Sequence, residues 1–133
     1  MTNDERQMNR SDRVQVDGKF FRLGARKFHV KGITYGPFAS NEKGEPFASP
    51  EQTASDFRLI KQLAVNALRL YYVPPPWLLE LAAEHGLKLL IDIPWPKHLC
   101  FLDSKKSQAE ARQVVREAVR SCRGHPAVCP PPP

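Results

Sequence analysis

The hydrophobic and polar positions of this chain alternate between short apolar runs and longer amphipathic stretches. Residues 65–73 form an apolar run of strand length that places Arg69 and Tyr71 at its carboxyl end, directly before three prolines. A run of this length between a helical pattern and a proline break is typical of a strand buried on both faces, as in parallel sheets. Residues 87–93 repeat this plan and lead into a polar and aromatic loop at 94–98. The two runs therefore predict neighbouring central strands.

The part of the chain before these runs is patterned differently. Residues 14–23 alternate around Asp17 and Gly18, and an Asp-Gly pair between alternating positions is the strongest local signal for a β-hairpin. Residues 28–34 alternate again, and we expect them to form the first strand of the main sheet. The loop at 39–48 has no periodicity and is long enough to be functional.

Three amphipathic stretches predict helices, at about residues 50–64, 77–85 and 107–123. The first begins with Ser49 as the N-cap and Pro50 at the first helical position, and Gln52 is placed to close a capping box. Its apolar positions are expected to be buried, at Phe57, Ile60, Leu63 and Ala64.

The order of the elements predicts an α/β fold. After the hairpin, a strand is followed by a helix three times, and residues 127–129 begin what reads as a fourth strand. Such alternation indicates a parallel sheet built from βαβ units. Prolines 130–133 cannot donate hydrogen bonds to a sheet, so that strand is expected to stop there. Three units fit either a small open sheet or the first part of an eight-unit barrel.

Composition places the chain among globular domains, with 41% hydrophobic and 26% charged residues. We expect a disordered polar tail at 1–13, one domain at 14–129 and a polyproline terminus at 130–133. No apolar run approaches the roughly 20 residues that a bilayer requires, and the amino terminus does not resemble a signal peptide, so a cytoplasmic location without a membrane segment is expected. Three cysteines without a paired spacing argue against disulfides and against a zinc site, and neither a metal nor another cofactor is expected.

The formal charge of +6 raises the possibility of a nucleic-acid partner. Four arginines fall on one face of the third helix, at positions 112, 116, 120 and 123. Apolar residues form the complementary stripe, so the arginines are interpreted as the solvated side of an amphipathic helix. Aromatic residues that could stack on bases do not alternate with them. We therefore expect no nucleic-acid partner.

Four segments carry a resemblance to a known group of enzymes. They are VDGKFF at 16–21, VKGITYG at 30–36, NALRLY at 66–71 and LAAEHGLKLLIDIPWP at 81–96. In this order they resemble the opening of the catalytic (β/α)₈ barrel of the glycoside hydrolase clan that includes families 2 and 5. The chain most resembles barrel domains of bacterial polysaccharide-processing proteins, which also contain a segment like GHPAV at 124–128. The resemblance implies a partial TIM barrel, with an N-terminal hairpin and three βα units, truncated before or within strand 4.

The resemblance also implies a retaining mechanism with two glutamates, at the ends of strands 4 and 7. Neither position exists in this chain, so no catalytic residue is assigned. Retaining hydrolysis requires two carboxyl groups about 5 to 5.5 Å apart. Among the acidic residues only Asp92 stands near the carboxyl end of a predicted strand.

The resemblance further implies a sugar-binding mouth, made by Arg69, Tyr35, Tyr71, Asp92, Trp95 and His98. Each assignment has a structural alternative. Arg69 is alternatively an internal ion-pair partner, and the two tyrosines are alternatively core residues. Trp95 is a platform for stacking a sugar ring or an aromatic residue packed over a loop, and Asp92 binds sugar hydroxyls or caps the following turn.

The predicted function is that of part of a glycoside hydrolase or transglycosylase acting on O-glycosyl bonds of polysaccharides or oligosaccharides. The chain alone is expected to be inactive, and its expected partners are a carbohydrate substrate and the remaining barrel segments of a longer parent protein. The alternative is a noncatalytic carbohydrate-binding or interaction module, in which prolines 130–133 adopt the extended conformation that partner proteins recognise.

Overall fold

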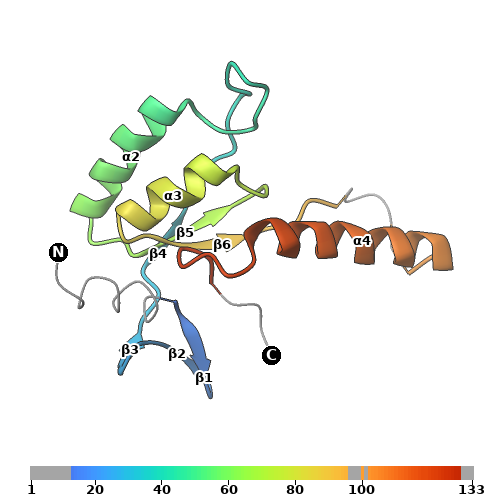
Figure 1. Ribbon diagram of the computed structural model, residues 1–133, viewed down its shortest axis with the longest axis horizontal. Coiled ribbons are helices and arrows are strands. Elements are labelled where there is room, and N and C mark those ends of the chain that lie inside the picture. Colours follow the sequence, from blue (N-terminus) through green and yellow to red (C-terminus); the bar gives the residue numbers. More distant parts are fainter. Residues whose placement is uncertain (1–12, 96–99, 101, 130–133) are drawn as a thin grey trace.

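The computed structural model describes residues 13–95, 100 and 102–129. Within these ranges the chain forms an antiparallel sheet of three strands, a parallel sheet of three strands and the helices α2, α3 and α4 (Figure 1). The expected polar tail lies outside the described residues except for Arg13, which is half-buried. The expected polyproline terminus at 130–133 and His98 also lie outside them.

The antiparallel sheet consists of β1 (Gln15–Asp17), β2 (Phe20–Leu23) and β3 (Arg26–Phe28). The predicted hairpin is confirmed, because β1 pairs with β2 across Gly18, whose φ of +62° suits glycine far better than other residues. A second turn at Gly24, also at +62°, returns the chain as β3. We call this small sheet the meander.

The prediction of a single strand at 28–34 is wrong. Phe28 pairs with β2 in the meander, whereas β4 (Gly32–Thr34) belongs to the parallel sheet. The side chain of Asn66 explains the break between them. Its Nδ2 donates to the carbonyl of His29 at 2.7 Å, and its Oδ1 accepts from the backbone N–H of Lys31 at 2.7 Å. These backbone groups are thus satisfied without continuing a ladder.

The parallel sheet has the order β4, β5 (Ala67–Leu70) and β6 (Lys88–Ile91). The connections are α2 (Pro50–Gln62) and α3 (Pro76–Glu84), and α4 (Lys105–Cys122) follows β6. This confirms the predicted alternation of strand and helix. A parallel bridge between Leu89 and Val128 places the predicted fourth strand beside β6.

Both connecting helices cover the same face of the parallel sheet (Figure 1). Three leucines of β5 and β6, at positions 68, 70 and 89, are fully buried with α2 and α3, and so is Leu87, which directly precedes β6. Phe57 and Ile60 of α2 are buried as predicted, but Leu63 is 71% exposed because the helix ends at Gln62. On the opposite face Thr34, Arg69 and Leu90 are level with one another and exposed.

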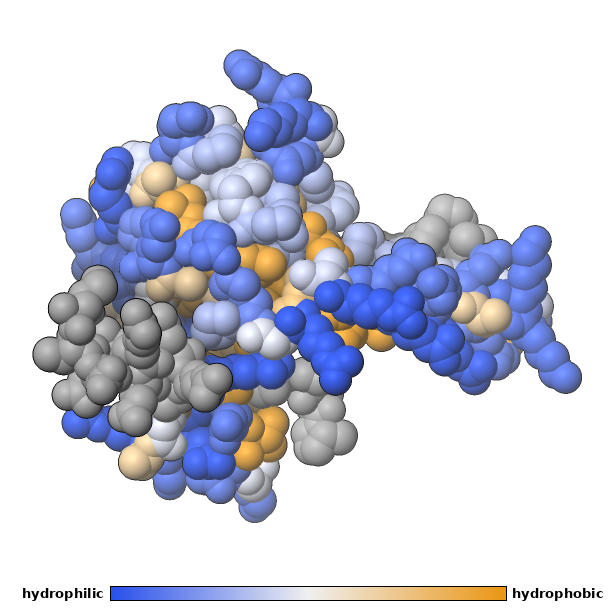
Figure 2. Space-filling model, in the orientation of Figure 1, coloured by the Kyte–Doolittle hydropathy of each residue, from blue (hydrophilic) through white to orange (hydrophobic). Residues whose placement is uncertain are grey.

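Helix α4 extends away from the rest of the molecule, and hydrophilic residues cover most of it (Figures 1 and 2). Ser104 caps its start by accepting from the backbone N–H of Ser107. The apolar stripe expected on this helix is buried only at Ala118 and Cys122. Val115 and Val119 remain 46% and 43% exposed.

Candidate functional site

Three of the expected site residues come together at the carboxyl edge of the parallel sheet. Arg69 lies on β5 between the buried Leu68 and Leu70, so its side chain projects from the face that the helices leave open. Asp92 follows the end of β6. The Arg69 Nη2 donates to Asp92 Oδ2 at 2.6 Å, and its Nε donates to the same oxygen at 3.1 Å. This two-pronged contact fixes the plane of the guanidinium.

Arg69 was expected to be either a residue of a sugar-binding mouth or an ion-pair partner, and the structure is compatible with both. The ion pair with Asp92 exists, and it lies at the open edge of the sheet, with side-chain exposures of 48% for the arginine and 34% for the aspartate. The hydrogen bond to Asp92, and then its negative charge, raise the pKa of Arg69. The guanidinium therefore stays cationic while both partners remain accessible to a ligand.

Tyr71 completes this group, because the guanidinium carbon of Arg69 lies 5.1 Å from the centre of its ring. Such a cation over an aromatic face is attracted by the ring's quadrupole. We call Arg69, Tyr71 and Asp92 the mouth cluster. It combines hydrogen-bond donors, acceptors and an apolar ring, the combination that recognises a sugar by its hydroxyls and its C–H face.

Tyr35 lies elsewhere, on the helix-covered side of the sheet. It is 7% exposed, and its ring packs 4.7 Å from that of Phe38 and 5.5 Å from that of Phe57, centre to centre. Its hydroxyl donates to Asp56 of α2. Burial, and then this hydrogen bond, raise the pKa of Tyr35 well above its ordinary value. The position matches the alternative of core packing.

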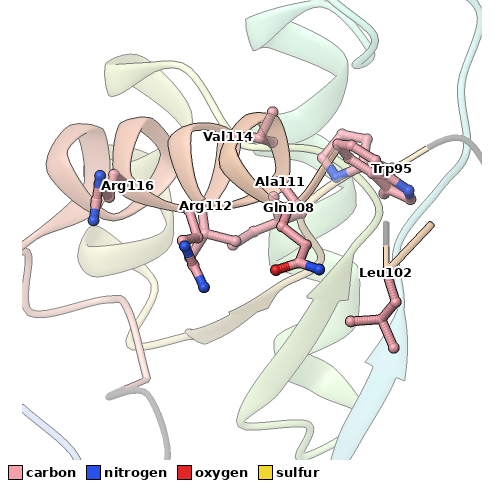
Figure 3. Close-up of a pocket in the computed structure, with 10 residues that line it drawn as sticks. Trp95, Leu102, Gln108, Ala111, Arg112, Val114 and Arg116 are labelled. Carbon is pink, nitrogen blue, oxygen red and sulfur yellow. The ribbon is translucent and has the colours of Figure 1, made fainter. Parts of the chain in front are cut away.

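Trp95 lines an open groove of about 510 Å³ beside α4 (Figure 3). Figure 3 shows Trp95 and Leu102 near one end of the groove, with Arg112 and Arg116 farther along the helix. Other apolar residues complete the lining, at positions 93, 94, 111, 114 and 115. The groove thus places Trp95 against the apolar stripe of α4.

A further group at this edge was not anticipated from the sequence. The loop after β4 is held by Asn41, whose Oδ1 accepts the backbone N–H groups of Lys43 and Glu45, each at 3.0 Å. The carboxylate of Glu45 accepts from Asn41 Nδ2 at 3.0 Å and from the indole N–H of Trp77 at 3.1 Å. These hydrogen bonds, Asn41 first, lower the pKa of Glu45. Asn41, three residues before Gly44, was the available signal in the sequence, but the hydrogen bond from Trp77 of α3 to Glu45 depends on the fold.

Two searches of the described residues bear on other kinds of site. No group of three or more histidine, cysteine, aspartate and glutamate side chains there is arranged to hold a metal ion. None of the helices in the same part of the chain combines the length and apolar character needed to span a membrane.

Comparison with known families gives a match over most of the chain. The family described as "Glucanosyltransferase" matches residues 4–120. A curated relative, 1,3-beta-glucanosyltransferase gel1 from Aspergillus fumigatus, is 28% identical over 89 residues, which is 64% of this chain and 20% of the relative. The chain thus spans about a fifth of the length of that relative.

Solved structures share the fold. The structure of Gas2 in complex with compound 10 matches 91% of this chain and 30% of its own, with a TM-score of 0.69 and 18% identity. The beta-glucuronidase of Parabacteroides merdae matches 86% of this chain and 14% of its own, with a TM-score of 0.68 and 21% identity. Both are glycoside hydrolases of the TIM-barrel type, so the expected resemblance and barrel architecture are confirmed at that level.

Proposed function

The chain belongs to the glucanosyltransferase family, and from this premise we propose that it forms the first three βα units of a barrel that binds and transfers segments of a β-1,3-glucan. Transfer is favoured over hydrolysis by the family and by relatives named 1,3-beta-glucanosyltransferase. The parallel bridge at Val128 is taken to be the start of the fourth barrel strand, beside which the remaining units pack.

The mouth cluster is the observation that carries this proposal. Active sites of barrel enzymes lie at the carboxyl ends of the strands, which is where Arg69, Tyr71 and Asp92 meet. In the proposed complex Arg69 donates to sugar hydroxyls, Asp92 holds the guanidinium in place, and Tyr71 faces the sugar ring. The groove at Trp95, proposed with His98 as part of the same binding region, extends the contact along the glucan.

The chain's own carboxylates are proposed to bind and position rather than to react. Retaining transfer needs one carboxylate as nucleophile and another carboxyl group as acid and base, about 5 to 5.5 Å apart. Asp92 is engaged by Arg69, and Glu45 by Asn41 and Trp77. In the proposed reaction the nucleophilic carboxylate bonds to the donor sugar as the O-glycosyl bond breaks, and the leaving oxygen takes the proton of the second carboxyl group. The hydroxyl of an acceptor sugar then gives its proton to that group and forms the new glycosyl bond as the bond to the nucleophile breaks. Later barrel strands supply both carboxyl groups.

Titration of the chain with a β-1,3-glucan oligosaccharide, with release of product followed in parallel, tests the proposal. We expect binding without turnover, and binding about 10-fold weaker for Arg69→Lys, because lysine keeps the charge but loses the planar fork. Arg58→Lys, the same change on the exposed side of α2, serves as the control. Equal affinities of the wild type and Arg69→Lys would contradict the role of the mouth cluster, and binding of unrelated neutral glycans with the same affinity would contradict the glucan assignment.

A further inference from the structure

The meander and its flanking residues carry a large excess of cationic over acidic side chains. Residues 13–31 contain six cationic side chains and one acidic one, a net of +5 in a chain whose total is +6. The cations are Arg13, Lys19, Arg22, Arg26, Lys27 and Lys31. This stretch is the meander with its flanking residues, and it precedes β4, so it lies at the amino edge of the parallel sheet, away from the mouth cluster (Figure 1).

Two of these cations are direct cross-strand neighbours. Arg22 of β2 is in register with Lys27 of β3, and Gln15 of β1 is in register with Arg22 on its other side. Side chains in register on antiparallel strands share a face of the sheet, about 5 Å apart at Cβ, and like charges placed this way destabilise the pairing. Both side chains are exposed, β2 and β3 contain no acidic residue, and the one acidic side chain on this face, Asp17 of β1, is in register with Phe20 rather than with either cation.

Contacts with uncharged neighbours hold the side chains of Arg22 and Lys27 in place on this face. The Arg22 guanidinium donates to the side-chain oxygen of Gln15. The Lys27 ammonium lies 4.5 Å from the centre of the Phe20 ring, and Phe20 itself is 50% exposed. Each head group is thus positioned by a neutral neighbour on the same face. Asp17 of β1 also lies on this face, in register with Phe20, but it forms no ion pair with either cation, so the face carries two positive charges and one negative charge.

We propose that this face of the meander, formed by Gln15, Asp17, Phe20, Arg22 and Lys27, binds the carboxylate groups of an acidic polysaccharide through Arg22 and Lys27. A carboxylate placed between Arg22 and Lys27 removes their repulsion and accepts charge-assisted hydrogen bonds from both. The choice of a glycan over a nucleic acid rests on the proposed function and on the single aromatic ring of this face, because strands of nucleic acid are held by several stacking platforms. The face would anchor the protein to a uronate-containing polymer while the mouth cluster binds a neutral glucan.

The test compares the full chain with the double variant Arg22→Gln and Lys27→Gln. The probes are an oligogalacturonate, a neutral β-1,3-glucan oligosaccharide and a single-stranded oligodeoxynucleotide of similar charge. We expect the double variant to bind oligogalacturonate about 10-fold more weakly, with glucan binding unchanged. The control is Arg58→Gln with Lys61→Gln on α2, which removes the same two residue types and should change the affinity less than about 2-fold.

The melting temperature of the double variant distinguishes a loss of binding from misfolding, and the binding of Arg69→Lys distinguishes this inference from the proposed function. The melting temperature of the double variant should equal or exceed that of the wild type, because a repulsive pair is removed. Equal losses in the test and control variants would overturn the inference, as would oligodeoxynucleotide binding as tight as that of oligogalacturonate. Loss of glucan binding through Arg69→Lys, with oligogalacturonate binding intact, tests the mouth cluster alone.

Discussion

Tyr35 shows how one hydroxyl joins two layers of the fold. It follows β4, its ring is buried among Phe38 and Phe57, and its hydroxyl donates to Asp56 of α2. The same carboxylate also accepts from Gln52 Nε2 at 2.8 Å, so Asp56 is held from its own helix as well. A buried polar group of this kind costs free energy unless it is bonded, which is why the pair matters for stability.

Replacement of Tyr35 by phenylalanine should lower the free energy of unfolding by about 1 kcal/mol, the usual value of one such hydrogen bond. Tyr72→Phe, at an exposed tyrosine, is the control and should change stability by less than about 0.5 kcal/mol. Urea titrations of the two variants provide the measurement. A Tyr35→Phe variant as stable as the control would mean that the hydroxyl contributes no net free energy.

The raised pKa of Tyr35 predicts a pH dependence with a definite sign. The unfolded tyrosine releases its proton near its ordinary value of 10.0, whereas the folded one keeps it to higher pH. The folded state then binds more protons, so the stability due to this group is full below about pH 10 and falls as the pH rises further. Above pH 10 the wild type should lose its stability advantage over Tyr35→Phe, which urea titrations at pH 8 and about pH 11 would show. A constant difference would contradict the prediction.

At the scale of elements, Asn66 connects the two sheets by binding the backbone on both sides of Val30. Asn66→Ala removes both hydrogen bonds and should lower the free energy of unfolding by about 1 to 3 kcal/mol. Amide hydrogen exchange should increase at residue 31, whose N–H loses its acceptor. Gln113→Ala, which removes an exposed bond to Glu117 along α4, is the control and should cost only a few tenths of a kcal/mol. Unchanged exchange at Lys31 would show that Asn66 does not hold this junction.

The elements that local chemistry determines are those that the sequence predicts well. The Asp17-Gly18 turn and the Ser49 cap act within a few residues, so their hairpin and helix start were correctly located. The break between β3 and β4 was missed because its cause, Asn66, is more than thirty residues away along the chain. Similarly, periodicity identified the apolar stripe of α4 but not that only Ala118 and Cys122 are buried, because burial depends on what the helix packs against.

The candidate site was predictable in part for the same reason. The position of Arg69 near the end of an apolar run placed it at the open edge, and Asp92 directly follows the end of the next strand, two residues beyond the partner of Arg69 in the register. The sequence did not determine which side of the sheet Tyr35 faces. Side chains alternate between the two faces within a strand, but Tyr35 lies just beyond the end of β4 and need not follow that alternation. The contact between Glu45 and Trp77 joins a loop to a helix and has no local signal.

At the scale of the whole molecule, one face of the parallel sheet is uncovered. Leu90 is 56% exposed on this face, whereas the interior-facing residues of a barrel are normally packed. An exposed apolar sheet face of this kind favours association. The isolated 133-residue chain is therefore expected to self-associate in sedimentation experiments.

Leu90→Thr should weaken that association by about 10-fold, because it removes an apolar side chain while keeping a good strand former. Leu63→Thr is the matched control, since Leu63 is 71% exposed but lies at the end of α2, away from the sheet. Wild-type chain that remains monomeric at all concentrations and melts in one sharp transition would contradict the prediction.

The bridge between Leu89 and Val128 has a consequence for how the polypeptide is made. The strands of the parallel sheet lie in the order in which a ribosome would release them, with β4 first and Val128 last. Each newly emerged strand finds its hydrogen-bonding partner in the one made just before it, so no segment must wait for a distant part of the chain. Each strand pairs with its predecessor in the sequence, so the loop that must close at each step is short, which favours rapid folding during synthesis. During synthesis β6 is therefore the exposed edge of the sheet. Until the next strand has been made, the unpaired backbone groups of this edge can pair with a strand of another chain.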